Sequence, residues 1–380
     1  MNRLLSAILA AVTLALIGGC AGAPSGERGI ALADQGYFFV GGAYTTTKDG
    51  QIRVGQMFVQ YQVPQNRTQP YPVVMWHGGG QTGTNFLGTP DGRPGWADYF
   101  LRQGYAVYVV DQPGRARSGF FTDVYGSTRR PNTAAMSTRF TAPGTTNLYP
   151  QAKLHTQWLG TGLPGDPVFD QFFASQVEDI ADINVIERLN REAGAALLDK
   201  IGAAILLTHS QSGPFGWVVA NDRPQLVKGI LAVEPNGPPF HENTTVGAPE
   251  WFKDGPLGRS WGITRGPLTY DPPADDPKAL AMTRQTAADG PDLVRCWLPA
   301  EQHKLPRLTG IPILIVVSEA SYHAPYDHCT SKFLSQAGVK HEFTRLPDIG
   351  IRGNGHMMML EKNSLEIAAL LHGWAQTNIK

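Results

Sequence analysis

Eight short segments rich in apolar and β-branched residues lie along the chain, and they constrain its fold more than any other feature. Each segment is bounded by Gly, Pro, Asn or Asp, as β-strands commonly are. The later segments are continuously apolar rather than alternating, which is typical of strands buried on both faces of a sheet. The predicted strands are 37–40, 57–63, 72–76, 105–110, 203–207, 229–233, 311–317 and 341–346.

Helical patterns lie between these strands. Apolar residues recur at spacings of three or four from Phe173 to Leu189, which predicts an amphipathic helix. Further helices are expected over 212–220, 327–336 and 364–377. Strands that alternate with helices predict an α/β fold with a mostly parallel central sheet and helices on both faces.

Two long stretches, 115–170 and 235–308, interrupt this alternation with many Pro and Gly residues and little regular pattern. We predict cap-like insertions that pack over an edge of the sheet, near the carboxyl ends of the strands where pockets form. For most of their aromatic residues, the simpler role of anchoring the insertion to the body is preferred. Their large aromatic side chains, which argue against disorder, include Trp158, Trp251, Trp261 and Trp297.

The charge balance excludes one class of partner. The chain has 32 Lys+Arg and 32 Asp+Glu, so its formal charge is zero, and no run of basic residues stands out. Binding to nucleic acid through a phosphate-tracking patch needs clustered Lys and Arg, so no nucleic-acid partner is expected. A hydrophobic fraction of 42% with 17% charged residues also excludes a largely disordered chain.

The N-terminal residues predict export. Arg3 precedes an uncharged apolar run over 4–17, which is typical of a secretory signal and shorter than the roughly 20 residues of a membrane span. The run ends in Ile-Gly-Gly-Cys, which resembles a bacterial lipobox. That resemblance implies a signal peptide over 1–19 and a lipid anchor on Cys20, in a periplasmic or outer-membrane lipoprotein. Ordinary cleavage near 21–23, giving a free secreted protein, is the alternative. A tether over 20–34 and a single domain over 35–380 are expected to follow.

Two cysteines remain after the leader, Cys296 and Cys329. In an oxidising compartment two thiols can pair, and we predict a disulfide between them. Two separate buried thiols are the alternative, because sequence spacing alone does not place them within bridging distance.

The strand predicted over 203–207 runs into 208–213, Thr-His-Ser-Gln-Ser-Gly. A buried strand, a tight turn of small residues and a helix form a nucleophile elbow, in which the sharp turn pushes a serine out of the sheet. Thr208 and Ser212 stand where the usual Gly-x-Ser-x-Gly pattern has glycines. Ser210 is the predicted nucleophile, with Ser212 as the competing choice. The alternative is an ordinary strand–helix turn whose serine caps the helix.

The strand predicted over 72–76 runs into a glycine-rich turn over 77–83, His-Gly-Gly-Gly-Gln-Thr-Gly. Glycines there let the backbone approach a substrate and present N–H groups to it. The alternatives are a turn without a ligand and a phosphate-binding loop. Against the latter, no Gly-Lys-Ser or Gly-Lys-Thr follows.

Together these two turns make the chain resemble the α/β-hydrolase superfamily over roughly residues 35–378, and the turn over 111–115, Asp-Gln-Pro-Gly-Arg, also looks like that family. The resemblance implies that the amides of Gly79 and Gln211 form an oxyanion hole. The family's chain order is serine, acid, histidine. The base is then His356, between the last strand and the last helix and flanked by glycines that free its loop.

The acid is less obvious, because the position after strand 311–317 where the family usually has Asp holds Ser321. The strand over 229–233 ends instead in Glu234, followed by Pro-Asn-Gly. This setting looks like a subgroup of bacterial esterases that places a Glu acid one strand early. Glu234 is therefore the predicted acid, and Glu319 and Asp327 are the alternatives.

The resemblance implies a serine hydrolase that cleaves a small-molecule or oligomeric carboxylic ester through an acyl-enzyme, without a cofactor or metal. A lactonase, amidase or acyltransferase would use the same residues, and a non-catalytic binding protein on this fold is a further alternative. Haloalkane dehalogenases and epoxide hydrolases need an Asp nucleophile, which position 210 does not hold.

A separate group of potential ligands lies near the second cysteine. Its members match no standard zinc pattern, and a disulfide would occupy the thiol, so a structural role is predicted. The group consists of His323, Asp327, His328 and Cys329.

Overall fold

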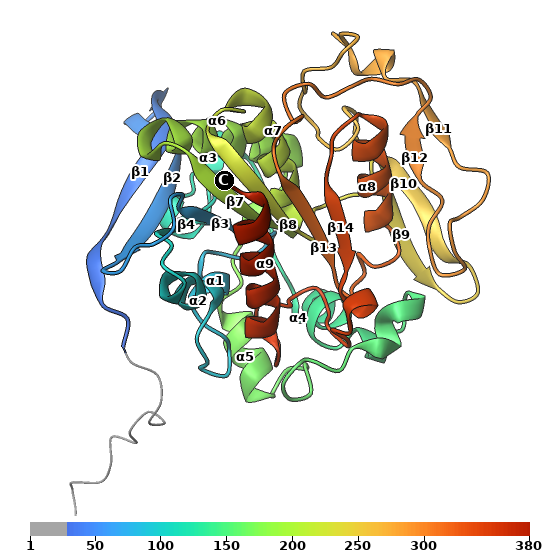
Figure 1. Cartoon of the computed structure of the whole chain (residues 1–380), viewed down its shortest axis with the longest axis horizontal. Helices are drawn as coiled ribbons and strands as arrows, with labels where there is room; N and C mark the ends of the chain where they lie inside the picture. The colour runs from blue at the N-terminus through green and yellow to red at the C-terminus, as the bar shows by residue number, and fades with distance from the viewer. Residues whose placement is uncertain (1–28) are drawn as a thin grey trace, which may run out of the picture.

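The computed structural model describes residues 29–380 and is built on an eight-stranded sheet of order β1-β2-β4-β3-β7-β8-β13-β14 (Figure 1). Each of the predicted strands is a strand of this sheet. Their bounds are β1 Leu32–Thr47, β2 Gly50–Pro64, β3 Val73–Trp76, β4 Val107–Asp111, β7 Ala204–His209, β8 Val227–Val233, β13 Ile313–Val317 and β14 Glu342–Arg345.

The sheet is mostly parallel, as predicted. β2 runs antiparallel to β1 and β4, and every neighbouring pair from β4 through β14 is parallel. On β7, Leu206 lies in the apolar core on one face and Leu207 in the core on the other. A central strand with both faces buried needs an apolar side chain at every position, which explains its continuous apolar sequence.

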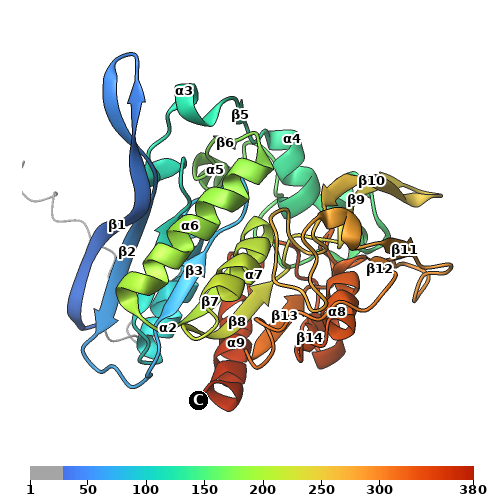
Figure 2. The same ribbon diagram turned by 90° about the horizontal axis from the view of Figure 1, so that it is seen from above.

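Helices cover both faces, as expected for this fold class (Figures 1 and 2). The apolar residues of α6, α7 and α8 belong to one core, and those of α1, α2, α5 and α9 to the other. Their bounds are α1 Thr84–Leu87, α2 Trp96–Arg102, α5 Pro167–Ala174, α6 Ile183–Ile201, α7 Gly213–Asp222, α8 Asp327–Gln336 and α9 Ser364–Asn378.

The helix predicted over 173–189 is wrong in its first half. α5 ends at Ala174, and a short strand, β6 (Asp179–Ile180), follows before α6 begins at Ile183. The Asp182 side chain accepts hydrogen bonds from the first amides of α6, which fixes its start. Ile180 keeps the apolar spacing because it is buried by tertiary packing, not because it is helical.

The insertion over 115–170 consists of short helices and turns: α3 (Thr122–Tyr125), a two-residue strand β5 (Thr128–Arg129), α4 (Thr133–Met136) and a π-helical turn (Ser137–Thr141). Trp158 packs edge-on against a phenylalanine of α5 within the second core, so this tryptophan anchors the insertion as expected. Two residues before Trp158, the Thr156 amide donates to the Gly353 carbonyl oxygen (2.9 Å) and links the insertion to the loop that carries His356.

The insertion over 235–308 forms two hairpins, β9 (Phe240–Gly247) with β10 (Trp251–Arg259) and β11 (Met282–Arg284) with β12 (Trp297–Pro299). They lie beyond the β14 edge of the sheet (Figure 1). Trp261 is buried in the first core, whereas Trp251 and Trp297 are only partly buried. Both insertions therefore use tryptophans as anchors.

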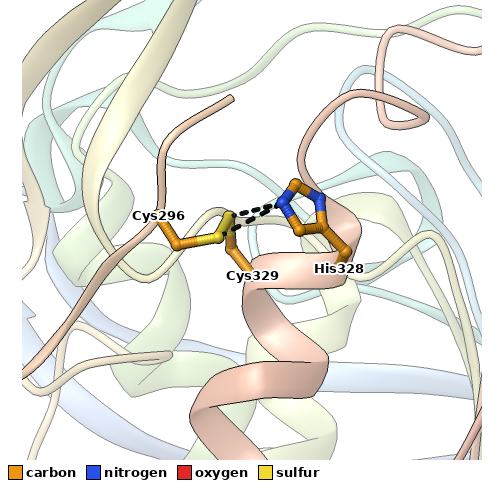
Figure 3. A group of neighbouring side chains, drawn as sticks. All are labelled: Cys296, His328 and Cys329. Carbon is orange, nitrogen blue, oxygen red and sulfur yellow. Dashed lines mark hydrogen bonds between the residues drawn. A yellow bond between two sulfur atoms is a disulfide. The ribbon is translucent and has the colours of Figure 1, made fainter. Parts of the chain in front are cut away.

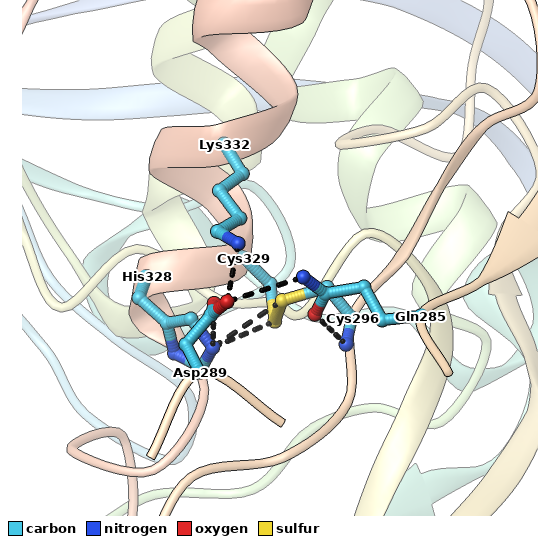
Figure 4. The surroundings of a disulfide bond; sticks show 6 residues. All are labelled: Gln285, Asp289, Cys296, His328, Cys329 and Lys332. Carbon is cyan, nitrogen blue, oxygen red and sulfur yellow. Dashed lines mark hydrogen bonds and ion pairs between the residues drawn. A yellow bond between two sulfur atoms is a disulfide. The ribbon is translucent and has the colours of Figure 1, made fainter. Parts of the chain in front are cut away.

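The predicted disulfide is present and joins the second insertion to α8. Cys296 and Cys329 are bonded, with their Cα atoms 5.3 Å apart (Figure 3). Figure 4 shows Gln285 and Lys332 beside it, both hydrogen-bonded to Asp289. Two segments 33 residues apart in sequence are thereby held together.

The leader predicted over 1–19, the lipid-anchor residue Cys20 and most of the expected tether lie outside the described residues. β1 begins at Leu32, which pairs with Pro64 of β2, so the sheet begins slightly earlier than the predicted domain start at residue 35. From residue 29 onward, no helix is both long enough and apolar enough to cross a membrane.

Candidate active site

The ends of two adjacent parallel strands bring the predicted nucleophile and acid together. β7 and β8 pair up to His209 and Val233, and the next residue on each strand is Ser210 and Glu234. Because parallel strands end at the same edge of a sheet, both side chains lie at that edge.

The turn at Ser210 has the backbone of a nucleophile elbow. Ser210 has φ 55°, in the left-handed region that costs a non-glycine residue about 1–3 kcal/mol, and its side chain projects from the end of β7. A Cβ on Gly213 would lie 2.4 Å from the Pro235 Cβ, so only glycine lets the start of α7 approach the residue after Glu234. The sharp turn and the close approach place Ser210 beside Glu234.

Ser212, the competing nucleophile, is engaged in structure. Its hydroxyl donates to the Trp76 carbonyl oxygen (2.7 Å) and accepts from the His209 amide (2.8 Å), and the residue is fully buried. The Ser212 side chain therefore links the elbow to the end of β3, and its hydroxyl does not face the candidate site.

The predicted base and acid are in direct contact. The His356 Nδ1–H donates to Glu234 Oε2 (2.5 Å), and both side chains are fully buried. Glu234 also accepts from the Ser318 amide (2.8 Å), the Ser318 hydroxyl (2.6 Å) and the Ser321 hydroxyl (2.7 Å). Burial alone would raise the pKa of Glu234, but the hydrogen bond to His356, its charge and the other donors hold that pKa at about 2. Glu234 is therefore a carboxylate held in place by its hydrogen bonds.

The two alternative carboxylates do not contact His356 within the described part of the chain. Glu319 accepts from the Arg352 guanidinium (2.8 Å) and from the Gly353 amide (2.7 Å). Asp327 is buried and pairs with the His323 Nδ1 (3.0 Å). The position where the family usually has its acid holds Ser321, which supports Glu234 instead of replacing it.

The His356 imidazole is enclosed by rings. His209, His323, Tyr322 and Phe140 lie 4.4, 4.6, 4.8 and 5.2 Å from it, centroid to centroid. Burial lowers the pKa of His356 below its usual 6.5, although the Glu234 carboxylate opposes this shift. The imidazole is therefore neutral near pH 7, the form that accepts a proton. Phe140 comes from the first insertion, which thus covers the site as a cap-like element.

The Nε2 atom of His356 lies 3.4 Å from the Tyr322 hydroxyl. The Ser210 side chain lies near the same hydroxyl and acts to lower the pKa of Tyr322. Across residues 29–380, no direct hydrogen bond joins the Ser210 and His356 side chains. In structures without substrate, catalytic hydrogen bonds are often long and tighten only in the complex. The structure thus brings serine, histidine and glutamate to one corner of the sheet and adds a tyrosine beside them.

The glycine-rich turn after β3 lies directly against the elbow. A Cβ on Gly78 would lie 3.0 Å from the Ser210 Cβ, and one on Gly79 would lie 3.6 Å from the Gln211 side chain. Gln211 is the second residue of the helical turn Ser210–Ser212 that leads into α7, and the first backbone amides of such a turn have no partner within it. Gly79 and Gln211 are thus adjacent across the site, as the predicted oxyanion hole requires.

Arg115 joins the two sides of this candidate oxyanion hole. Its buried guanidinium donates to the Gly78 carbonyl oxygen (2.8 Å) and to Gln211 Oε1 (3.1 Å), and it pairs with Asp179 (2.9 Å). Asp179 also pairs with Arg129 (2.7 Å). The sequence placed Arg115 in a family-like turn but did not reveal this role, which depends on contacts across the fold.

The loop before His356 rests on a buried glutamate. Glu361 accepts from the Gly355 amide (2.9 Å) and from the Asn354 side-chain amide (2.8 Å), and it contacts the His155 Nε2 (2.7 Å). His155 comes from the first insertion, so the insertion helps to hold the base. Nothing in the sequence singled out Glu361 or Tyr322.

The potential metal ligands noted in the sequence do not form one centre. His323 pairs with Asp327 beside His356, whereas the His328 Nε2 lies 3.3 Å from Cys296 Sγ and 3.6 Å from Cys329 Sγ (Figure 3). The two sulfurs are bonded to each other and therefore offer no thiolate. Glu234, His323 and His356 also converge, but Glu234 already accepts hydrogen bonds on both oxygens.

Residues 73–370 match the model of the Alpha/beta hydrolase family, and the chain belongs to this family. It is 47% identical over 341 residues to the "Probable secreted lipase phiG" of Fungal sp. (strain ATCC 74256), covering 90% of this chain and 89% of that protein. The fold is also similar to the solved structure titled "The Atomic Resolution Structure of a Novel Bacterial Esterase". That match has a TM-score of 0.62 and 24% identity and covers 93% of this chain and 98% of the other.

Proposed function

We propose that this protein is a serine hydrolase that cleaves carboxylic esters, with Ser210 as nucleophile, His356 as base and Glu234 as acid. The observation that carries the proposal is the hydrogen bond of His356 to Glu234, which follows β8, the strand next to the one that ends at Ser210. Because Nδ1 of His356 makes this hydrogen bond, Nε2 faces the hydroxyl of Tyr322, which lies near Ser210. A relative named as a lipase, 47% identical, supports an ester substrate.

Catalysis begins when the neutral His356 takes the Ser210 proton at Nε2 while Ser210 Oγ attacks the ester carbonyl. Glu234 holds the Nδ1–H tautomer and stabilises the imidazolium that forms. The Gly79 and Gln211 amides donate to the developing oxyanion, and loss of one such donor typically costs about 2.7–4 kcal/mol.

The tetrahedral intermediate then collapses. The bond from carbon to the leaving oxygen breaks, the electron pair goes to that oxygen, and His356 gives it the proton. The acyl-enzyme on Ser210 remains. A water molecule attacks it with His356 again as base, and the acid product leaves. A lactonase, amidase or acyltransferase would follow the same steps, and analysis of the products distinguishes these reactions.

We also propose that the chain is exported. Its leader-like N-terminal sequence and a relative named as a probable secreted lipase support this. The lipobox-like end of the leader favours a lipid anchor at Cys20. Mass spectrometry of the mature N-terminus tests this point, and an unmodified start beyond Cys20 would exclude the anchor.

The central test is Ser210→Ala. We expect loss of hydrolysis of p-nitrophenyl esters and of labelling by a fluorophosphonate. Ser331→Ala is a matched control, because it removes a serine hydroxyl that contacts a histidine, the His341 Nε2 (2.8 Å), on α8 outside the site. The control variant should still hydrolyse these esters and still be labelled by the fluorophosphonate. If Ser210→Ala hydrolyses these esters as the unmodified protein does, the proposed nucleophile is wrong.

A further inference from the structure

Tyr322 lies against both reacting side chains, and no motif in the sequence accounts for it. Its hydroxyl is 3.4 Å from the His356 Nε2, the atom that exchanges protons in the proposed mechanism, and it lies near the Ser210 side chain. Its ring lies 4.8 Å from the imidazole, centroid to centroid. The side chain is only partly buried, so a substrate group can reach it.

The order of the sheet places Tyr322 opposite the oxyanion turn. The nucleophile follows β7, whose neighbour on one side is β3 and on the other β8, followed by β13. The turn with Gly79 follows β3, whereas Tyr322 follows β13. When the carbonyl oxygen of a bound ester points to Gly79 and Gln211, its leaving oxygen must lie toward His356, on the side of Tyr322.

The phenol is suited to donate a hydrogen bond. Burial raises the pKa of Tyr322 to about 12, although the charge of Arg139 and the nearby Ser210 side chain oppose the shift. The hydroxyl therefore keeps its proton at neutral pH and does not act as a base. Because it lies 3.4 Å from Nε2, one oxygen atom can be within hydrogen-bond distance of both atoms.

We propose that Tyr322 is a further catalytic residue, whose hydroxyl donates a hydrogen bond to the leaving oxygen of the ester. The inference rests on the proposed function. As the carbon–oxygen bond breaks, the electron pair moves to the leaving oxygen, which takes its proton from the His356 Nε2. The phenol proton stays on Tyr322. The same hydroxyl then orients the water that attacks the acyl-enzyme.

The proposal predicts a dependence on the leaving group. A hydrogen bond matters most when the leaving oxygen carries much negative charge, as for a basic alkoxide, and least for p-nitrophenolate. Hydrogen bonds to charged groups correspond to a factor on the order of 10 to 100 in rate. We therefore expect Tyr322→Phe to lower kcat/KM about twofold or less for p-nitrophenyl acetate and on the order of 10- to 100-fold for ethyl acetate.

The experiment compares the full-length protein, Tyr322→Phe and the control Tyr326→Phe on p-nitrophenyl, phenyl, trifluoroethyl and ethyl acetate. Tyr326 lies close in the chain, with its ring 6.4 Å from that of Tyr322, but makes no ring contact with His356 within the described residues. Tyr326→Phe should therefore change kcat/KM for all four esters by the same small factor.

A loss in Tyr322→Phe that grows with the basicity of the leaving group supports the proposal. An equal loss for all four esters, no loss, or a gain in rate would overturn it, because packing or steric obstruction by Tyr322 does not depend on leaving-group charge. Fluorophosphonate labelling of Ser210 in each protein distinguishes a failure of the proposed function from a failure of the proposed role of Tyr322. If the unmodified protein is neither labelled nor active on any ester, the proposed function fails and the role of Tyr322 fails with it.

Discussion

Replacing Glu234 by glutamine tests the proposed base and acid most directly. The carboxylate accepts through Oε1 from the Ser318 amide and hydroxyl and through Oε2 from His356 and the Ser321 hydroxyl. A glutamine has only one oxygen. The Ser318 amide is a fixed donor, so the oxygen must stay on its side, and the NH₂ group of the new side chain then faces the His356 Nδ1.

The expected magnitude follows from the tautomer. An Nδ1 that faces an NH₂ donor must accept a hydrogen bond, which moves the imidazole proton to Nε2. That nitrogen then has no lone pair for the Ser210 proton. The corresponding change in a Ser-His-Asp protease lowers kcat about 10⁴-fold through the wrong tautomer. We expect a loss of similar size for Glu234→Gln, which is about 5 kcal/mol in the activation free energy.

The assay is kcat on a p-nitrophenyl ester, with thermal unfolding as the check on folding. Glu319→Gln is the matched control, since it makes the same chemical change in a carboxylate that contacts Arg352 and Gly353 rather than His356. We expect it to lower kcat by less than about tenfold. A folded Glu234→Gln variant with kcat within tenfold of the unmodified protein would refute the reasoning, as would an equal loss in the control.

Three further changes have defined outcomes. Arg115→Met removes the guanidinium that joins Gly78 to Gln211 and should lower kcat about 10- to 100-fold, because a misplaced oxyanion donor costs no more than a lost one. The control Arg129→Met removes a contact to the same Asp179 but none to the glycine-rich turn, so it should lower kcat clearly less. An equal loss of kcat in both variants would contradict the role of Arg115. The lowered pKa of His356 predicts that kcat/KM falls only as pH drops through a value below 6.5, where the imidazole becomes protonated and stops accepting protons. A pH–rate profile of kcat/KM measures this fall, and a midpoint of the fall above pH 6.5 would contradict the prediction. Replacing Cys296 and Cys329 together by serine should lower the free energy of unfolding by about 3–4 kcal/mol, as expected for a disulfide that closes a loop of this length, and urea titration measures the difference.

The sequence by itself determined the central sheet and the turns at its edge. Continuous apolar, β-branched runs between turn residues have a favourable environment only in a sheet covered on both faces, which is where the buried strands β3, β4, β7, β8 and β13 lie. The elbow at Ser210 and the position of Glu234 followed from the same strand ends. Local chemistry was enough there, because a chain that leaves a strand through a sharp turn presents its next side chain at the edge.

Only the tertiary structure decided which other groups serve the site. Arg115 reaches Gln211 across 96 positions of sequence, and Glu234 reaches His356 across 122. Periodicity misled over 173–189 for the same reason, since Ile180 is apolar because of the core it packs against and not because of a helix. Tyr322 carries no local signal at all. Its position depends on how the strands are ordered in the sheet, and strand order is set by packing of the whole chain and not by any short stretch of residues.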